Sequence, residues 1–143
     1  MTFPVDRIID THAYEFYVAY ADTDGGGVIY HTRYIEHCER ARAKMFLDHG
    51  ISLKKAANSS NEGVIIVVSE VTCTYIASAS FEDRVLIETR ASSASGARMV
   101  FDHQIYSGGD LKAECKVVLA CIDSKMRTAV RVPDLFKKVF NSN

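Results

Sequence analysis

The segment from Tyr20 to Tyr34 places two carboxylates directly before three glycines and a histidine, in the order YADTDGGGVIYHTRY. Consecutive glycines leave the backbone free to turn tightly and to bring main-chain N–H groups close to a ligand. A helical pattern begins at Tyr30, and the N-terminus of a helix favours negative charge. The order of carboxylate, glycine loop and helix start therefore predicts an acid or nucleophile beside a site for developing negative charge.

Asp24 is the main candidate for chemistry in this segment. A carboxylate can attack an activated carbonyl, or activate a water molecule, without a metal ion. His31 is the second candidate, because an imidazole can orient water or carry a proton near neutral pH. The ordinary alternatives are an Asp that starts a glycine-rich turn and a His ring in solvent. Asp22 is expected to be structural, capping the turn or pairing with a nearby base.

The same segment resembles the signature of the 4-hydroxybenzoyl-CoA thioesterase family, which has the hotdog fold. The resemblance spans roughly residues 14–133, and the continuation from His31 to Arg42 is similar to the bacterial branch that works beside the Tol-Pal envelope system. Ser78 and Ala79 depart from the pattern, because the family usually has a Pro-Ala step there. The residues that carry the match are Tyr20, Asp22, Thr23, Asp24, Gly27, Val28, Ile29, Tyr30 and Tyr34.

The resemblance implies an acyl-CoA thioesterase, which releases a carboxylic acid and free CoA and needs neither a metal nor a redox cofactor. Asp24 would act as nucleophile or general base, with the His31 side chain as its functional partner. The His31 main-chain N–H would polarise the thioester carbonyl, and Gly27 would let the chain turn into the helix. Tyr30 and Tyr34 would line an acyl pocket or, alternatively, pack in the core together with Tyr20.

The resemblance also implies a second subunit, because family members close an open pocket with another copy of the chain. We therefore expect a homodimer or a homotetramer, with envelope proteins or acyl-carrier proteins as further candidate partners. Two other classes remain open. One is an acyl-carrier hydratase or dehydratase, against which the Asp22–Gly27 loop argues. The other is a non-catalytic acyl-CoA-binding or scaffold protein of an envelope complex.

Composition narrows the class of protein. The 143 residues suit a single domain over 1–143, and the formal net charge of −1 gives no field that favours nucleic acid. No apolar run is long enough to span a membrane, and the N-terminus has no signal-peptide pattern, so we expect a cytoplasmic protein. The four cysteines form no C-x-x-C pair and are expected to be buried, reduced thiols.

Hydrophobic periodicity predicts one strand, a long helix and four more strands. On the helix, Tyr34, Cys38, Ala41 and Met45 share one face, while Glu39 and Arg42 are expected to form an ion pair. Closely spaced strands pair antiparallel, so the pattern predicts an α+β fold, and the resemblance specifies a hotdog: a curved antiparallel sheet of about five strands around one long helix. The expected ranges are strands 12–20, 64–75, 85–92, 98–106 and 111–123, the long helix 30–49, a short helix that Ser52 caps, and a terminal helix 133–140.

Overall fold

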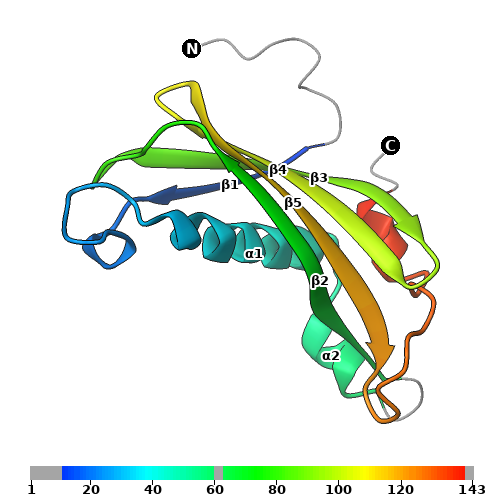
Figure 1. Ribbon diagram of the computed structural model, residues 1–143. Helices are drawn as coiled ribbons and strands as arrows, with labels where there is room; N and C mark the ends of the chain where they lie inside the picture. Colours follow the sequence, from blue (N-terminus) through cyan, green and yellow to red (C-terminus); the bar gives the residue numbers. More distant parts are fainter. Residues whose placement is uncertain (1–10, 60–62, 141–143) are drawn as a thin grey trace.

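The structure, a computed structural model, describes residues 11–59 and 63–140. Its sheet has five antiparallel strands in the order β1-β3-β4-β5-β2 and curves over the long helix α1 (Figure 1). The predicted hotdog arrangement is therefore confirmed. No helix among the described residues is long and apolar enough to cross a membrane. The elements are β1 (His12–Tyr17), α1 (His31–Asp48), α2 (Leu53–Ala57), β2 (Val64–Tyr75), β3 (Arg84–Ser95), β4 (Arg98–Ser107) and β5 (Asp110–Asp123).

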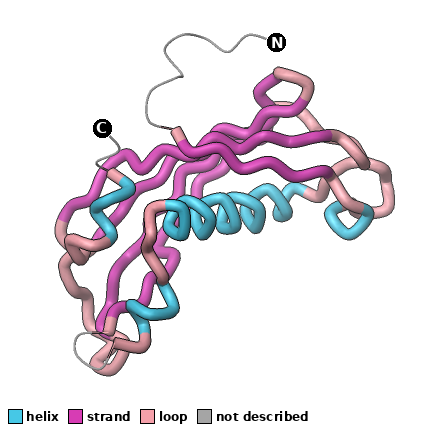
Figure 2. The backbone as a smooth tube through the Cα atoms, turned by 180° about the vertical axis from the view of Figure 1, so that it is seen from behind, coloured by secondary structure: helices cyan, strands magenta, loops and turns pink. Residues whose placement is uncertain are grey.

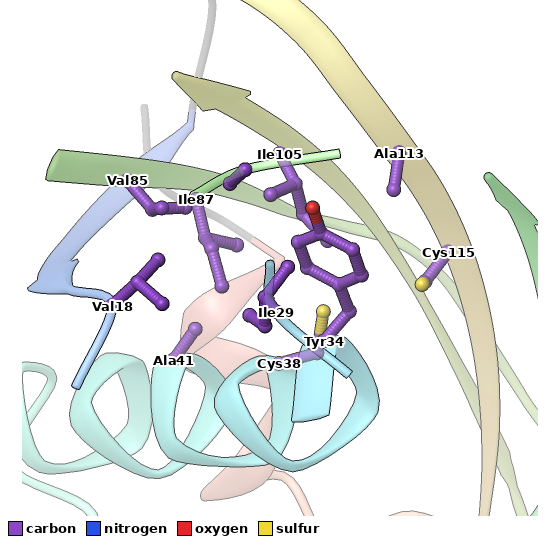
Figure 3. Packing of buried hydrophobic residues seen from close by; sticks show 11 residues of the cluster. Val18, Ile29, Tyr34, Cys38, Ala41, Val85, Ile87, Ile105, Ala113 and Cys115 are labelled. Atoms are coloured by element: carbon purple, nitrogen blue, oxygen red, sulfur yellow. The ribbon is translucent and has the colours of Figure 1, made fainter. Parts of the chain in front are cut away.

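The apolar face of α1 determines how the helix sits on the sheet. Tyr34, Cys38, Ala41 and Met45 are all buried, as their spacing predicts. The first three pack in one cluster with residues of β3, β4 and β5 (Figure 3). Burying one large apolar side chain contributes roughly 1.5–3 kcal/mol, so this stripe holds α1 firmly. Leu47, near the C-terminal end of α1, is 65% exposed and lies outside this stripe.

The ends of two elements differ from the prediction. β1 ends at Tyr17, and Tyr20–Asp22 form a 3₁₀ turn in which the Asp22 carboxylate accepts a hydrogen bond from the Ala19 N–H. Within the expected terminal helix 133–140, only Phe136–Val139 are helical, again as a 3₁₀ turn. Figure 2 shows these two turns at opposite ends of the sheet. α2 follows the prediction, since the Ser52 hydroxyl accepts a hydrogen bond from the Lys55 N–H.

The cysteines are only partly as predicted. Cys73 of β2 lies directly opposite Cys115 of β5, with their Cα atoms 4.2 Å apart, and the two form a disulfide. The expectation of four reduced thiols is therefore wrong for this pair, because the residues lie far apart in the sequence and only the strand register brings them together. Cys38 and Cys121 are buried and free, as predicted. Burial raises the pKa of the Cys38 thiol to about 12.

Arg42 turns into the protein, so the predicted ion pair with Glu39 is wrong. Arg42 is only 5% exposed, and its guanidinium donates a hydrogen bond to Nε2 of His103 at 3.0 Å. Because guanidinium only donates, the proton of the neutral imidazole lies on Nδ1, which is 2.8 Å from the Thr89 hydroxyl. Burial, together with the Arg42 charge, lowers the pKa of His103 to about 3.

This buried imidazole predicts a specific pH dependence of stability. Below the ordinary histidine pKa of 6.5 the unfolded chain protonates His103, whereas the folded protein takes up this proton only near pH 3. Stability is therefore lost as the pH falls. Between about pH 6.5 and about pH 5, the unfolding free energy of the wild type is expected to fall by about 1.5 kcal/mol more than that of a His103→Gln variant. Urea titrations measure both values, and equal losses would contradict the prediction.

Candidate active site

The glycine loop is closed at its base by main-chain pairing. Thr23 and Ile29 form an antiparallel bridge, and the Tyr30 N–H donates to the Asp22 carbonyl at 2.8 Å. Residues 24–28 therefore project as a loop at the N-terminal end of α1, drawn in blue in Figure 1. Gly25 and Gly27 have φ values of +89° and +88°. Only glycine adopts this backbone readily, so the tight loop depends on these two residues.

The connection between β2 and β3 supports the other side of the loop. The Ile29 N–H donates to the Ala79 carbonyl, and the Phe81 N–H donates to the Gly27 carbonyl, both at 2.8 Å. Ala79 is completely buried. The main chain thus holds the connection against the loop although Ser78 stands where the family pattern has proline. All of these contacts are main-chain hydrogen bonds, which fix the loop without requiring particular side chains.

Asp24 lies exposed on this loop. Its Oδ1 accepts a hydrogen bond from the Gly26 N–H at 2.8 Å, which is the turn-starting contact typical of Asp. Within the described residues, Oδ2 has no hydrogen-bond partner. The turn-starting alternative for Asp24 is therefore confirmed, while its exposed position leaves a chemical role as a prediction.

The first turn of α1 follows the loop directly. The helix begins at His31, and Tyr30 precedes it without a side-chain cap. The first N–H groups of a helix have no partner within the helix and attract negative charge. The His31 ring is exposed and lies between Tyr30, with ring centres 4.6 Å apart, and Tyr75, at 5.7 Å. A main-chain donor and an imidazole thus occupy the same helix end.

A cavity of about 210 Å³ lies between this helix end and the end of β2. It contains two predicted site residues, His31 and Tyr34, but not Asp24, Gly27 or Tyr30. Tyr34 is 2% exposed, and burial raises the pKa of its hydroxyl. Its side chain therefore packs in the core and also lines the cavity. Tyr20 and Tyr30 are 74% and 44% exposed, and the core alternative is wrong for them. The lining residues are Ile29, His31, Tyr34, Tyr75, Ile76, Ala77 and Ser78.

Sequence reasoning missed Tyr75 and Ile76 as cavity residues, because they read only as the end of a strand. It assigned no site role to His37, whose ring contacts Asp22 at the base of the loop. A larger hollow, of about 570 Å³, includes Glu88, Arg90 and Asp102 from the sheet face opposite α1. This hollow includes no residue of the glycine loop, so the smaller cavity is the better candidate for the active site.

Comparison with known proteins agrees with this geometry. Residues 18–140 match the family described as the thioesterase-like superfamily. The chain is 36% identical to the acyl-CoA thioester hydrolase YbgC of Escherichia coli over 107 residues, which cover 74% of this chain and 78% of that protein. It is 28% identical to the acyl-CoA thioesterase YbgC of Haemophilus influenzae, with 87% and 90% of the two chains covered.

Solved structures give the same result. A 1,4-dihydroxy-2-naphthoyl-CoA thioesterase from Synechocystis is 25% identical and superposes with a TM-score of 0.84, covering 92% of this chain and 96% of that one. A probable thioesterase from Bartonella henselae is 31% identical, with a TM-score of 0.80 and coverage of 86% and 99%. The exposed carboxylate, the loop and the helix end therefore lie in a fold shared with thioesterases, and the chain belongs to the thioesterase-like superfamily.

Proposed function

We propose that the chain hydrolyses the thioester bond of acyl-CoA and releases a carboxylic acid and free CoA. The observation that carries this proposal is the exposed Asp24 carboxylate, held on a loop that leads directly into the first turn of α1. A carboxylate on a loop that leads into a helix can act on a carbonyl whose oxygen the first N–H groups of that helix stabilise. The acyl-CoA thioester hydrolases among the relatives support the same reaction.

Each site residue then has a role in this proposal. Asp24 attacks the thioester carbonyl or activates water, and the His31 main-chain N–H polarises the carbonyl oxygen. The His31 ring helps to position water. Gly27 provides the backbone turn. Tyr34 contacts the acyl group from the wall of the cavity, and the exposed Tyr30 contacts it from outside. No metal or redox cofactor takes part in this scheme.

The first test is Asp24→Asn, which keeps the size of the side chain and removes its charge. We expect kcat for acyl-CoA hydrolysis to fall on the order of 10²-fold or more, because the nucleophile or base is lost. Thiol release from acyl-CoAs of graded chain length measures the rate. Asp134→Asn is a matched control, since this carboxylate is exposed and lies next to the C-terminal 3₁₀ turn.

Near wild-type turnover by pure, folded Asp24→Asn protein would refute the assignment. Absence of thiol release by the wild type with every acyl-CoA would instead favour an acyl-carrier hydratase or dehydratase, or a non-catalytic scaffold.

The route of hydrolysis can be tested separately. Asp24 uses one oxygen to hold the Gly26 N–H, and the His31 ring lies exposed at the adjacent helix end. Together they favour activation of water over attack by Asp24 itself. After a single turnover in ¹⁸O-labelled water, we expect label in the product acid and none in the Asp24 peptide. Label in that peptide by mass spectrometry would show a mixed anhydride opened at the Asp24 carbonyl.

We also propose that the chain forms a homodimer or homotetramer through β2. This strand lies at an edge of the sheet and exposes apolar side chains, a combination that favours pairing with another strand. Tyr75 and Ile76 also line the cavity, so a second copy on this edge would cover its open side. The exposed apolar residues of β2 and its end are Val67, Val68, Val71, Tyr75 and Ile76.

Sedimentation at micromolar concentration is expected to show a dimer or larger species. The double variant Val68→Lys/Val71→Lys should shift the protein to monomer, because two charges on the shared edge repel across a two-fold axis. Its thiol-release activity should fall with the loss of the dimer. A fully active wild-type monomer would contradict the proposal.

We further infer that residues 1–143 act as one catalytic domain in the cytoplasm, without nucleic acid. The near-zero net charge gives no field that favours nucleic acid. Envelope and acyl-carrier proteins remain the candidate macromolecular partners.

A further inference from the structure

A buried carboxylate lies at the base of the glycine loop, two residues before Asp24. Asp22 is only 9% exposed. Its Oδ2 accepts a hydrogen bond from the Ala19 N–H at 2.9 Å, and its Oδ1 lies 3.0 Å from Nε2 of His37. Both oxygens of Asp22 therefore contact protein donors. Asp24 differs, because within the described residues only its Oδ1 accepts a hydrogen bond.

His37 is itself held by two other elements. It belongs to α1, and its ring stacks face to face on Phe16 of β1, with ring centres 3.5 Å apart and an angle of 3° between the planes. The Nδ1 atom is buried and has no hydrogen-bond partner within the described residues. Nε2 and the Asp22 carboxylate thus supply the polar contact that orients the ring, so the two side chains fix each other.

The main chain of Asp22 carries this constraint to the site. Its carbonyl accepts the hydrogen bond from the Tyr30 N–H at 2.8 Å, and Tyr30 directly precedes the first residue of α1. One residue therefore anchors both the segment that leads to Asp24 and the segment that returns to His31. Arg33 adds a weaker link, because its guanidinium donates to the Ala21 carbonyl at 3.1 Å.

The charges around Asp22 favour its ionised form. Partial burial opposes ionisation, but the Ala19 N–H, the hydrogen bond and charge of His37, and the charge of Arg33 together lower the pKa of Asp22. The ionised carboxylate is the form that accepts two hydrogen bonds at once. A small cavity of about 130 Å³ beside the pair is lined by both acidic and basic side chains, including Glu36 and Arg40. This balance favours a positioning role over the binding of an ion.

We propose that Asp22 and His37 form a positioning pair, which sets the Asp24 carboxylate relative to the His31 N–H by tying the base of the loop to α1 and β1. This inference rests on the proposed thioesterase reaction. Neither residue touches the reacting atoms. A displacement of about 1 Å at a reacting group can cost up to about 10²-fold in rate, so a loosened base would slow the reaction while substrate still binds.

Two variants separate the hydrogen bond from packing. His37→Phe keeps an aromatic ring on Phe16 and removes the donor, and Asp22→Asn keeps the shape and removes the charge. We expect each to lower kcat by about tenfold, with KM within about twofold. The double variant should be no slower than either single variant, because the two side chains act as one unit. His37→Gln, which restores a donor, should recover part of the rate.

The chain offers a matched control in a second His–Asp pair. His12 lies 2.7 Å from Asp48 and joins β1 to the C-terminal end of α1. His12→Phe removes a comparable contact away from the loop, so it is expected to leave kcat unchanged even if thermal stability falls. A loss of kcat in this control equal to that in His37→Phe would overturn the positioning role.

Amide hydrogen exchange gives a readout that does not depend on activity. The Tyr30 N–H should exchange faster in Asp22→Asn and His37→Phe than in the wild type or in His12→Phe. Faster exchange in these two variants, together with no thiol release by the wild type, would support the anchoring role of the pair but refute the proposed reaction. Unchanged exchange and unchanged kcat in both variants would overturn the positioning pair while the reaction stands.

Discussion

The packing of α1 against the inner face of the sheet is the constraint on which the other features depend. The buried stripe of Tyr34, Cys38 and Ala41 fixes both the rotation and the height of the helix. Because the helix is fixed, its first turn always meets the end of β2 and the glycine loop. The positions of the cavity, of the first N–H groups of the helix and of the polar contacts of the loop all follow from this single arrangement.

In the loop, the backbone determines the path of the chain and the side chains supply the carboxylates. Main-chain hydrogen bonds hold the loop to residues 79–81, and two glycines with positive φ allow its path. Asp22 and Asp24 then differ only in their surroundings. The first is enclosed by donors and is structural, whereas the second keeps an oxygen toward solvent. Two carboxylates of one short motif thus acquire different environments through burial and hydrogen bonding.

Much of the fold could be predicted from local patterns, because periodicity records which face of an element is buried. The stripe of α1, the strand ranges and the cap at Ser52 are of this kind. What the sequence could not reveal depends on partners from distant segments. Cys73 meets Cys115 only through strand register, and Arg42 turns inward because the sheet offers His103 as an acceptor. Likewise, His37 gains its role only once β1 and the loop converge on it.

The main-chain hydrogen bonds between the loop and the β2–β3 connection also bear on how the sequences of such proteins diverge. These hydrogen bonds join the main chain of Gly27 and Ile29 to that of Phe81 and Ala79, so most side chains there can vary without changing the path of the loop. This tolerance agrees with a TM-score of 0.84 at only 25% identity to one thioesterase. The side chains that line the cavity, such as Tyr75 and Ile76, can therefore change between relatives while the path of the loop is inherited through the peptide backbone.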